Sequence, residues 1–171
     1  MSNLPPHIES VELSALEVKK YEIFAVPLSQ VKEKPVFSNK EFKKSLEKNF
    51  NLDLSKSLLD WPDFKGKSGE IIEIPISKKG FKATRIYLVG TGSEEREDLR
   101  KAAISLARKV KTSGLKVASG LTQDKALLTS HVMSLILASY IWNLKSEKSK
   151  GQAAFTIVGR KADLAKAIAH G

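Results

Sequence analysis

The segment that most constrains the fold runs from residue 85 to residue 92 and reads Arg-Ile-Tyr-Leu-Val-Gly-Thr-Gly. Its apolar side chains alternate, with Ile86 and Leu88 on one side and Tyr87 and Val89 on the other. A strand that is apolar on both sides is typical of a sheet covered by helices on both faces. We therefore expect the rest of the chain to pack around this strand.

A second strand is expected directly before it. Ile72, Ile74 and Ile76 alternate with other residue types, which predicts one buried side. Pro75 has no backbone N–H to give to a neighbouring strand, so we expect a sheet edge or a strand end there. Residues 78–80, Lys-Lys-Gly, fit a hairpin turn that joins the two strands.

The rest of the chain alternates between strand and helix patterns. We expect further strands over residues 8–13, 21–28, 115–118 and 153–158, and helices over residues 39–50, 53–61, 94–113, 124–144 and 162–170, with Glu94, Glu95 and Glu97 in the first turn of the third helix. Pro27 is expected to end its strand, residues 29–38 to form a polar connection, and residues 145–151 a charged loop. This order predicts an α/β fold with a mixed, mostly parallel sheet, helices on both faces and an antiparallel hairpin at one edge.

Three features locate the helices more closely. Asn39 and Asp53 are of the type that caps helix N-termini. Leu99 to Val110 follows the spacing of an amphipathic helix. The segment 124–144 is apolar on most sides, and we expect Leu135 to face the sheet while either the N-terminal helices or a partner cover another side of this helix.

Length and composition bound the class of protein. The 171 residues predict a single domain, and the chain stops inside an unfinished helix, so we expect a truncated protein. There is no cysteine, which excludes disulfides and thiolate metal sites and indicates a reducing compartment. The N-terminus lacks the pattern of a secretory signal, and the apolar run 126–142 is too short and too polar to cross a bilayer. We expect a cytoplasmic protein without a membrane partner.

The charge is strongly positive. Lysine and arginine number 29 against 19 aspartates and glutamates, which gives a net charge of +10. The lysines are scattered among glutamates, and no RNP-type or helix-turn-helix motif accompanies them. This pattern favours a solvated lysine surface, with nucleic-acid binding as the alternative.

The turn Gly90-Thr91-Gly92 is the first candidate binding site. It follows a buried strand and precedes a helix, where backbone N–H groups can cradle a phosphate. However, Glu95 replaces the third glycine of the dinucleotide fingerprint, and glutamates at 94, 95 and 97 would repel pyrophosphate. The sequence therefore favours a tight structural turn.

Other candidate side chains carry weaker signals. His7, His131 and His170 lack metal-ligand spacing, and His131 is expected to be a hydrogen-bonded core histidine. Asp60 and Asp63 could bind a metal, but turn and cap roles are commoner for such residues. We assign no catalytic, cofactor-binding or metal-binding residue.

Five stretches in order nevertheless carry a family resemblance. They are residues 63–70 (Asp-Phe-Lys-Gly-Lys-Ser-Gly-Glu), 86–92, 99–103 (Leu-Arg-Lys-Ala-Ala), 138–145 with Trp142 and Leu144 as departures, and 165–171. Together they resemble the N-terminal domain of the leucyl (cytosol) aminopeptidases, from about Tyr21 to Gly171.

The resemblance implies a specific function for the parent protein. Members of this family are two-domain hexameric enzymes that use two divalent metals, zinc or manganese, to release N-terminal residues from peptides. The metals and catalytic residues lie in a C-terminal domain that is absent here, while the N-terminal domain is macro-domain-like and helps assembly and active-site access. Some bacterial members also bind DNA.

Two hypotheses from different classes follow. The first is that residues 1–171 are the non-catalytic N-terminal domain of a leucyl aminopeptidase, inactive alone, with its own catalytic domain and further subunits as partners. The alternative is a stand-alone macro-like module for ADP-ribose or a nucleotide, supported by the glycine turn at residues 90–92.

Overall fold

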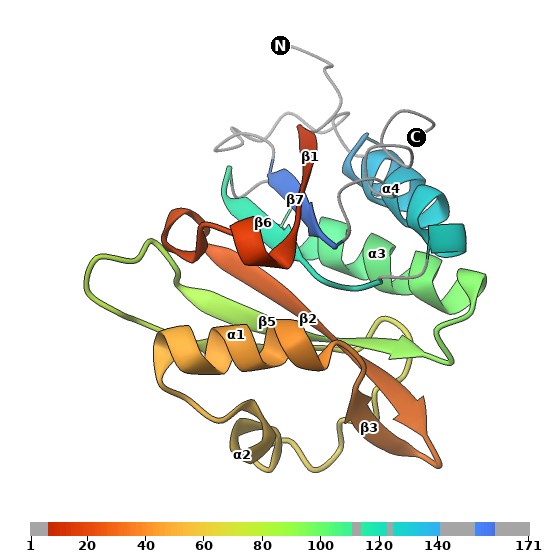
Figure 1. Cartoon of the computed structure of the whole chain (residues 1–171). Coiled ribbons are helices and arrows are strands. Elements are labelled where there is room, and N and C mark those ends of the chain that lie inside the picture. The colour runs from red at the N-terminus through yellow and green to blue at the C-terminus, as the bar shows by residue number, and fades with distance from the viewer. Residues whose placement is uncertain (1–6, 111–113, 123–124, 141–152, 160–171) are drawn as a thin grey trace, which may run out of the picture.

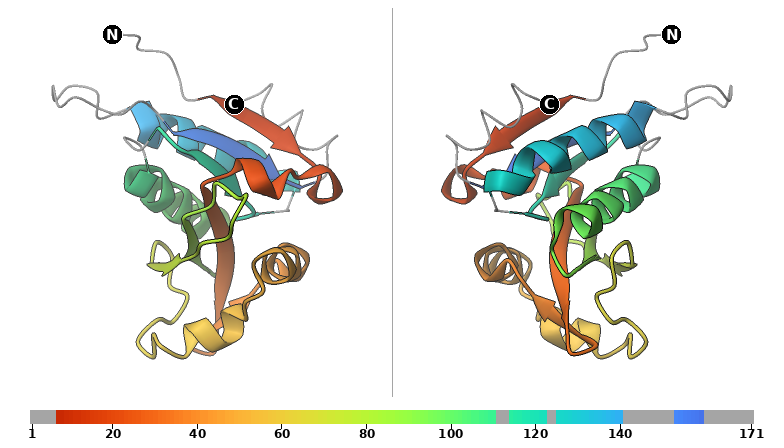
Figure 2. Two further views of the ribbon diagram at one scale, coloured as in Figure 1. Left: turned by 90° about the vertical axis from the view of Figure 1, so that its left-hand side faces the viewer. Right: turned by 90° about the vertical axis from the view of Figure 1, so that its right-hand side faces the viewer.

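A computed structural model describes residues 7–110, 114–122, 125–140 and 153–159. In these ranges a sheet lies between helices on its two faces (Figures 1 and 2). The strands are β1 (Ile8–Val11), β2 (Ile23–Val31), β3 (Lys34–Phe37), β4 (Ile71–Pro75), β5 (Arg85–Gly92), β6 (Lys116–Ser119) and β7 (Ala154–Val158). The α-helices are α1 (Lys40–Phe50), α2 (Leu54–Leu58), α3 (Arg96–Val110) and α4 (Lys125–Tyr140), and two 3-10 turns cover Leu13–Ala15 and Val18–Lys20.

The strand order is β1-β7-β6-β2-β5-β4, with β3 paired to β2. The neighbours β1 and β7, β7 and β6, β6 and β2, and β2 and β5 are parallel, whereas β2–β3 and β4–β5 are antiparallel. This confirms the mixed, mostly parallel sheet and the edge hairpin, and it places Pro75 on the edge strand β4. The strand β5, around which we expected the chain to pack, is second from that edge. The centre of the sheet lies nearer β2.

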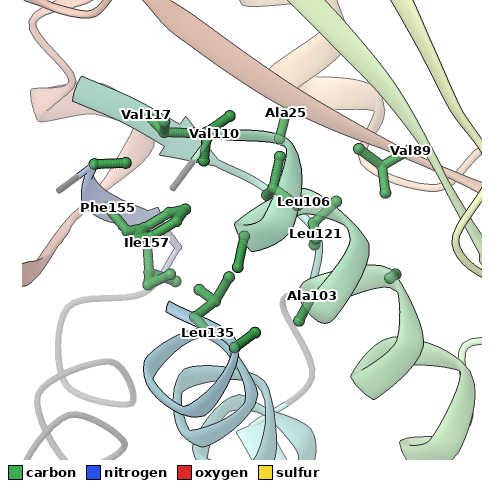
Figure 3. Packing of buried hydrophobic residues seen from close by; sticks show 14 of the residues in the cluster. Ala25, Val89, Ala103, Leu106, Val110, Val117, Leu121, Leu135, Phe155 and Ile157 are labelled. Carbon is green, nitrogen blue, oxygen red and sulfur yellow. The ribbon is translucent and has the colours of Figure 1, made fainter. Parts of the chain in front are cut away.

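Each face of the sheet has its own core. Tyr87 and Val89 pack with α3 and α4, whereas Ile86 and Leu88 pack with α1 and α2. All four side chains are at most 1% exposed, which confirms that β5 is buried on both sides. Figure 3 shows the first of these cores, where Leu106 of α3, Leu135 of α4 and Ile157 of β7 gather.

The expectation that Pro27 ends its strand is wrong. Strand β2 continues through Pro27 to Val31. An extended residue points its N and its C=O to the same side, and the Pro27 oxygen accepts a bond from the Ser38 N–H at 3.3 Å. The proline nitrogen therefore faces the gap between the end of β6 and the start of β3, where no N–H is needed.

The polar connection expected at residues 29–38 is also wrong. This segment is a hairpin of β2 and β3, in which Val31 pairs with Lys34. The turn residues Lys32 and Glu33 have φ of 48° and 61°, as a two-residue type I′ turn requires. Lysine and glutamate adopt positive φ only at a cost in free energy, so this pair does not indicate such a turn. The Asn-Gly or Asp-Gly pair that normally signals it is absent here.

Both predicted N-caps are confirmed. The Asn39 Oδ1 accepts a bond from the Phe42 N–H at 3.2 Å, and the Asp53 Oδ1 accepts one from the Lys56 N–H at 3.1 Å. The six apolar residues predicted to face inward from α3 are all buried.

Residues 141–151 and the helix expected at 162–170 lie outside the described residues. In the ranges that the structure describes, none of the helices has the length and apolarity needed to cross a membrane.

Candidate functional site

The glycine turn Gly90-Thr91-Gly92 uses its backbone donors within the protein. The Gly90 N–H donates to the Glu70 carbonyl at 2.7 Å, and the Gly92 N–H donates to the Gly66 carbonyl at 2.9 Å. A Cβ atom on Gly90 would lie 2.0 Å from the Lys67 carbonyl oxygen. The segment 66–70 therefore occupies the place where a phosphate would sit, and the geometry favours the structural turn.

The loop that fills this place is itself held by a carboxylate. The Glu70 Oε2 accepts bonds from the N–H groups of Lys65 at 3.0 Å and Gly66 at 3.2 Å. The Ser68 hydroxyl donates to the Asp98 carbonyl oxygen at 2.5 Å. The backbone donors at Lys65 and Gly66 thus bind an internal anion instead of a ligand.

The start of α3 differs from the expected arrangement of glutamates. Only Glu97 and Asp98 lie in its first turn, because the helix begins at Arg96. The Asp98 Oδ2 accepts bonds from the backbone N–H and the hydroxyl of Ser93, both at 2.8 Å. These bonds, the backbone one first, hold the pKa of the Asp98 carboxyl below its usual range.

A crevice lies where the chain leaves β2 and β6. These parallel neighbours continue to opposite faces, β2 through β3 to α1 and β6 to α4. Such a switch point at the carboxyl ends of parallel strands is where α/β sheets commonly bind ligands. A cavity of about 180 Å³ lies there, lined by Pro27, Ser38, Asn39, Glu94, Gly120, Leu121, Thr122 and Leu127.

Asn39 and Gly120 join the two sides of this crevice. The Asn39 Nδ2 donates to the Gly120 carbonyl at 3.1 Å, and the Gly120 N–H donates to the Ala25 carbonyl at 3.0 Å. A Cβ on Gly120 would meet the Phe42 ring at 2.5 Å, so the close approach of α1 to the end of β6 needs glycine. No local sequence pattern indicates this site, because its residues are far apart in the chain and meet only through the strand order.

The other predicted candidates are not brought together. His7 is exposed, and its Nε2 lies 3.6 Å from the Oε2 of Glu9. Both Asp60 and Asp63 are exposed, and His170 lies outside the described residues. Within the described ranges, no three His, Cys, Asp or Glu side chains form a group that could hold a metal ion.

His131 lies on α4 and is buried, as expected, but it is not hydrogen-bonded. Its exposed fraction is 1%, and neither ring nitrogen has a hydrogen-bond partner among the residues that the structure describes. Burial lowers the pKa of the imidazole to about 4. The expected hydrogen-bonded state is thus wrong, and the helix keeps a neutral histidine in its buried side.

This histidine predicts an acid-sensitive stability. In the unfolded chain the imidazole takes up a proton below its ordinary pKa of about 6.5, whereas in the folded chain it stays neutral down to about 4. The free energy of unfolding should therefore fall as the pH drops between these values, by about 2 kcal/mol at pH 5 relative to pH 8. Urea melts of the parent and of His131→Leu at both pH values measure this. The same pH dependence in both proteins would contradict it.

A second concave surface lies between α3 and α4. It is lined by Arg96, Glu97, Arg100, Ser130, Met133, Ser134 and Leu137, with a volume of about 310 Å³. Met133 and Leu137 are 36% and 50% exposed, which is unusual for large apolar side chains on one helix. We call this surface the α3–α4 groove.

Comparisons with known proteins agree with this fold. The profile of the cytosol aminopeptidase family, N-terminal domain, matches residues 26–148. A mutant of tomato leucine aminopeptidase has a similar structure, with a TM-score of 0.65 and 18% identity over 98% of this chain and 36% of that chain. The bottromycin maturation enzyme BotP, in complex with Mn, gives a TM-score of 0.53 and 13% identity over 87% of this chain and 29% of that chain.

The sequence identity and the coverage of these matches decide whether they show the family or only the fold. At such identities the two structures show the fold alone, and this chain spans only about a third of their length. The sequence matches none of the curated proteins. The profile match, by contrast, covers most of the chain, from within β2 through α4.

Proposed function

Because the chain belongs to the cytosol aminopeptidase family through its N-terminal domain, we propose that it is the non-catalytic N-terminal domain of a leucyl aminopeptidase. The parent enzyme would release N-terminal amino acids from peptides with two divalent metals. The observation that carries this proposal is the profile match over residues 26–148. A cytoplasmic location, expected from the cysteine-free sequence, forms part of it.

The metals of the parent enzyme belong outside the described part of this chain. The family is one of metallo-aminopeptidases, and the similar enzyme BotP is in complex with Mn. The donor groups here do not fit a metal pair, because the described residues bring no three suitable side chains together. We therefore assign the two metals, zinc or manganese, and the catalytic residues to a C-terminal domain.

The role left for this domain is contact with the rest of the enzyme. An N-terminal domain of this family associates with its catalytic domain. We assign that contact to the α3–α4 groove, since Met133 and Leu137 offer apolar area that the described residues leave exposed. Assembly as a hexamer and control of access to the active site belong to the same proposal.

Nucleotide binding is not favoured as the function. The backbone donors of Gly90 and Gly92 are bonded to the loop at residues 66–70, so the feature that suggested a phosphate site is occupied by the protein itself. No contact among the described residues favours nucleic-acid binding over a solvated lysine surface.

An aminopeptidase assay tests the proposal. We expect no hydrolysis of leucyl-p-nitroanilide above background when this chain is incubated with Mn²⁺ or Zn²⁺, because the residues that would hold the metals lie in another domain. Full-length tomato leucine aminopeptidase serves as the positive control. Metal-dependent turnover by this chain would overturn the proposal.

A further inference from the structure

Among the described residues that line the crevice between β2 and β6, Glu94 is the one with an ionisable side chain. Its side chain is half-buried, and it forms no ion pair with any residue in the described ranges. A carboxylate at a cavity wall that has no cationic partner among the described residues contributes a negative potential to the cavity, even though the chain as a whole carries a net charge of +10.

The position of this carboxylate is fixed by the turn that carries it. Glu94 has a φ of 63°, in the left-handed region where glycine is the usual residue. Its Oε1 accepts a bond from the hydroxyl of Thr91 at 3.3 Å, and Thr91 is fully buried. The side chain is therefore held toward the crevice by a buried donor, at a backbone conformation that costs free energy.

Two side-chain donors at the crevice are hydrogen-bonded to backbone carbonyls. The Ser38 hydroxyl donates to the Pro27 carbonyl at 3.4 Å, and the Asn39 amide donates to the Gly120 carbonyl at 3.1 Å. The Pro27 carbonyl also accepts a bond from the Ser38 N–H at 3.3 Å, which occupies its second lone pair, whereas the Gly120 carbonyl oxygen has a second lone pair for a further donor. The lining therefore suits a ligand that brings its own N–H donors and positive charge.

The size and the apolar lining narrow the ligand further. A cavity of about 180 Å³ accepts a molecule the size of an amino acid, and is smaller than the pockets that hold drug-sized ligands. Leu121 and Leu127 supply apolar lining beside the polar groups.

We propose that this crevice binds small primary ammonium compounds with an apolar stem, with Glu94 as the counter-ion of the ammonium group. Amino acid amides, free amino acids and short peptides carry such a group. The proposal stands on the geometry of the crevice and does not depend on the function proposed for the whole protein, but it would give an aminopeptidase a second site for the ammonium group of its substrates or products.

Calorimetry with leucinamide and N-acetyl-leucinamide tests this proposal. The two probes share the leucine stem and differ in the ammonium group. We expect saturable, millimolar binding of leucinamide and none of N-acetyl-leucinamide. Binding of both probes alike, or of neither, would overturn the proposal.

Two variants and a matched control locate the site. Glu94→Gln should weaken leucinamide binding at least about tenfold, the scale of one charged hydrogen bond. Glu94→Gly should weaken it equally, and it also removes the backbone strain of a non-glycine residue at positive φ. Glu95→Gln removes an exposed neighbouring carboxylate and should leave binding unchanged. Unchanged binding in both Glu94 variants, with melting curves like that of the parent, would contradict the assignment. Hydrolysis of leucyl-p-nitroanilide tests only the proposed aminopeptidase parentage, whereas calorimetry tests only the ammonium site. The two proposals can therefore fail separately.

Discussion

Gly90→Ala is expected to destabilise the domain by at least about 3 kcal/mol, beyond the usual cost of overpacking. The added Cβ would lie 2.0 Å from the Lys67 carbonyl oxygen and 2.9 Å from the Gly66 carbonyl carbon. Both are backbone atoms, so no side-chain rotation can relieve the overlap. The loop would have to leave β5, and the bonds that join Gly90 to Gly69 and Glu70 would be lost with it.

Urea melts of Gly90→Ala and Gly80→Ala separate this overlap from backbone strain. Gly80 has a φ of 83°, but a Cβ there would meet nothing within 4 Å. Gly90 has no positive φ, so its substitution tests the steric overlap alone. We expect Gly80→Ala to cost about 1 kcal/mol. A cost for Gly90→Ala no greater than that of Gly80→Ala would show that the loop does not pack on the turn as described.

Leu135→Ala should destabilise the domain by about 2–5 kcal/mol, as for other buried leucines. Leu135 is 0% exposed and belongs to the core shared by α3, α4 and the sheet. Figure 3 shows it on the side of α4 that faces Ile157 and Ala103. Removing its side chain leaves a cavity among side chains that rigid elements hold in place.

Leu137→Ala is the matched control on the same helix. Leu137 is 50% exposed and lines the α3–α4 groove, so its loss should cost less than about 1 kcal/mol in the isolated chain. Chemical denaturation of the two variants under one buffer measures the difference. Equal losses would mean that α4 does not present Leu135 to the core, and the helix would then be better described as an uncovered interface.

Much of the fold could be predicted because local patterns and packing agree. The alternation of Ile86 to Val89 predicted a strand buried on both sides, and the spacing from Leu99 to Val110 predicted the buried side of α3. The caps Asn39 and Asp53 were predicted from residue type alone. Each of these features depends on neighbours within a few positions of the chain.

The errors lie where distant segments decide the structure. Pro27 continues its strand because β6 ends and β3 begins beside it, and the sequence around residue 27 carries no sign of either. The hairpin turn at Lys32 and Glu33 adopts positive φ without glycine or asparagine. Both features follow from the tertiary arrangement, which overrides local preference.

The candidate site shows the same division. The glycine turn at residues 90–92 was visible in the sequence, but the loop that fills it could be found only once Lys67 was placed against Gly90. Glu94 was predicted to repel phosphate, and its role at the crevice follows from the crossing of the chain between β2 and β6. A sequence pattern cannot place a switch point without the order of the strands.

The most direct test of the proposed parentage is the mass of the natural protein that carries this chain, measured with its activity. Antibodies raised against the chain would capture the protein from its source cells, and denaturing mass spectrometry would give the subunit mass beside an assay with leucyl-p-nitroanilide and Mn²⁺. We predict a subunit well above the 18.9 kDa of this chain, with metal-dependent aminopeptidase activity, since the chain covers only 36% of the tomato enzyme. A captured protein of 18.9 kDa without such activity would contradict the account.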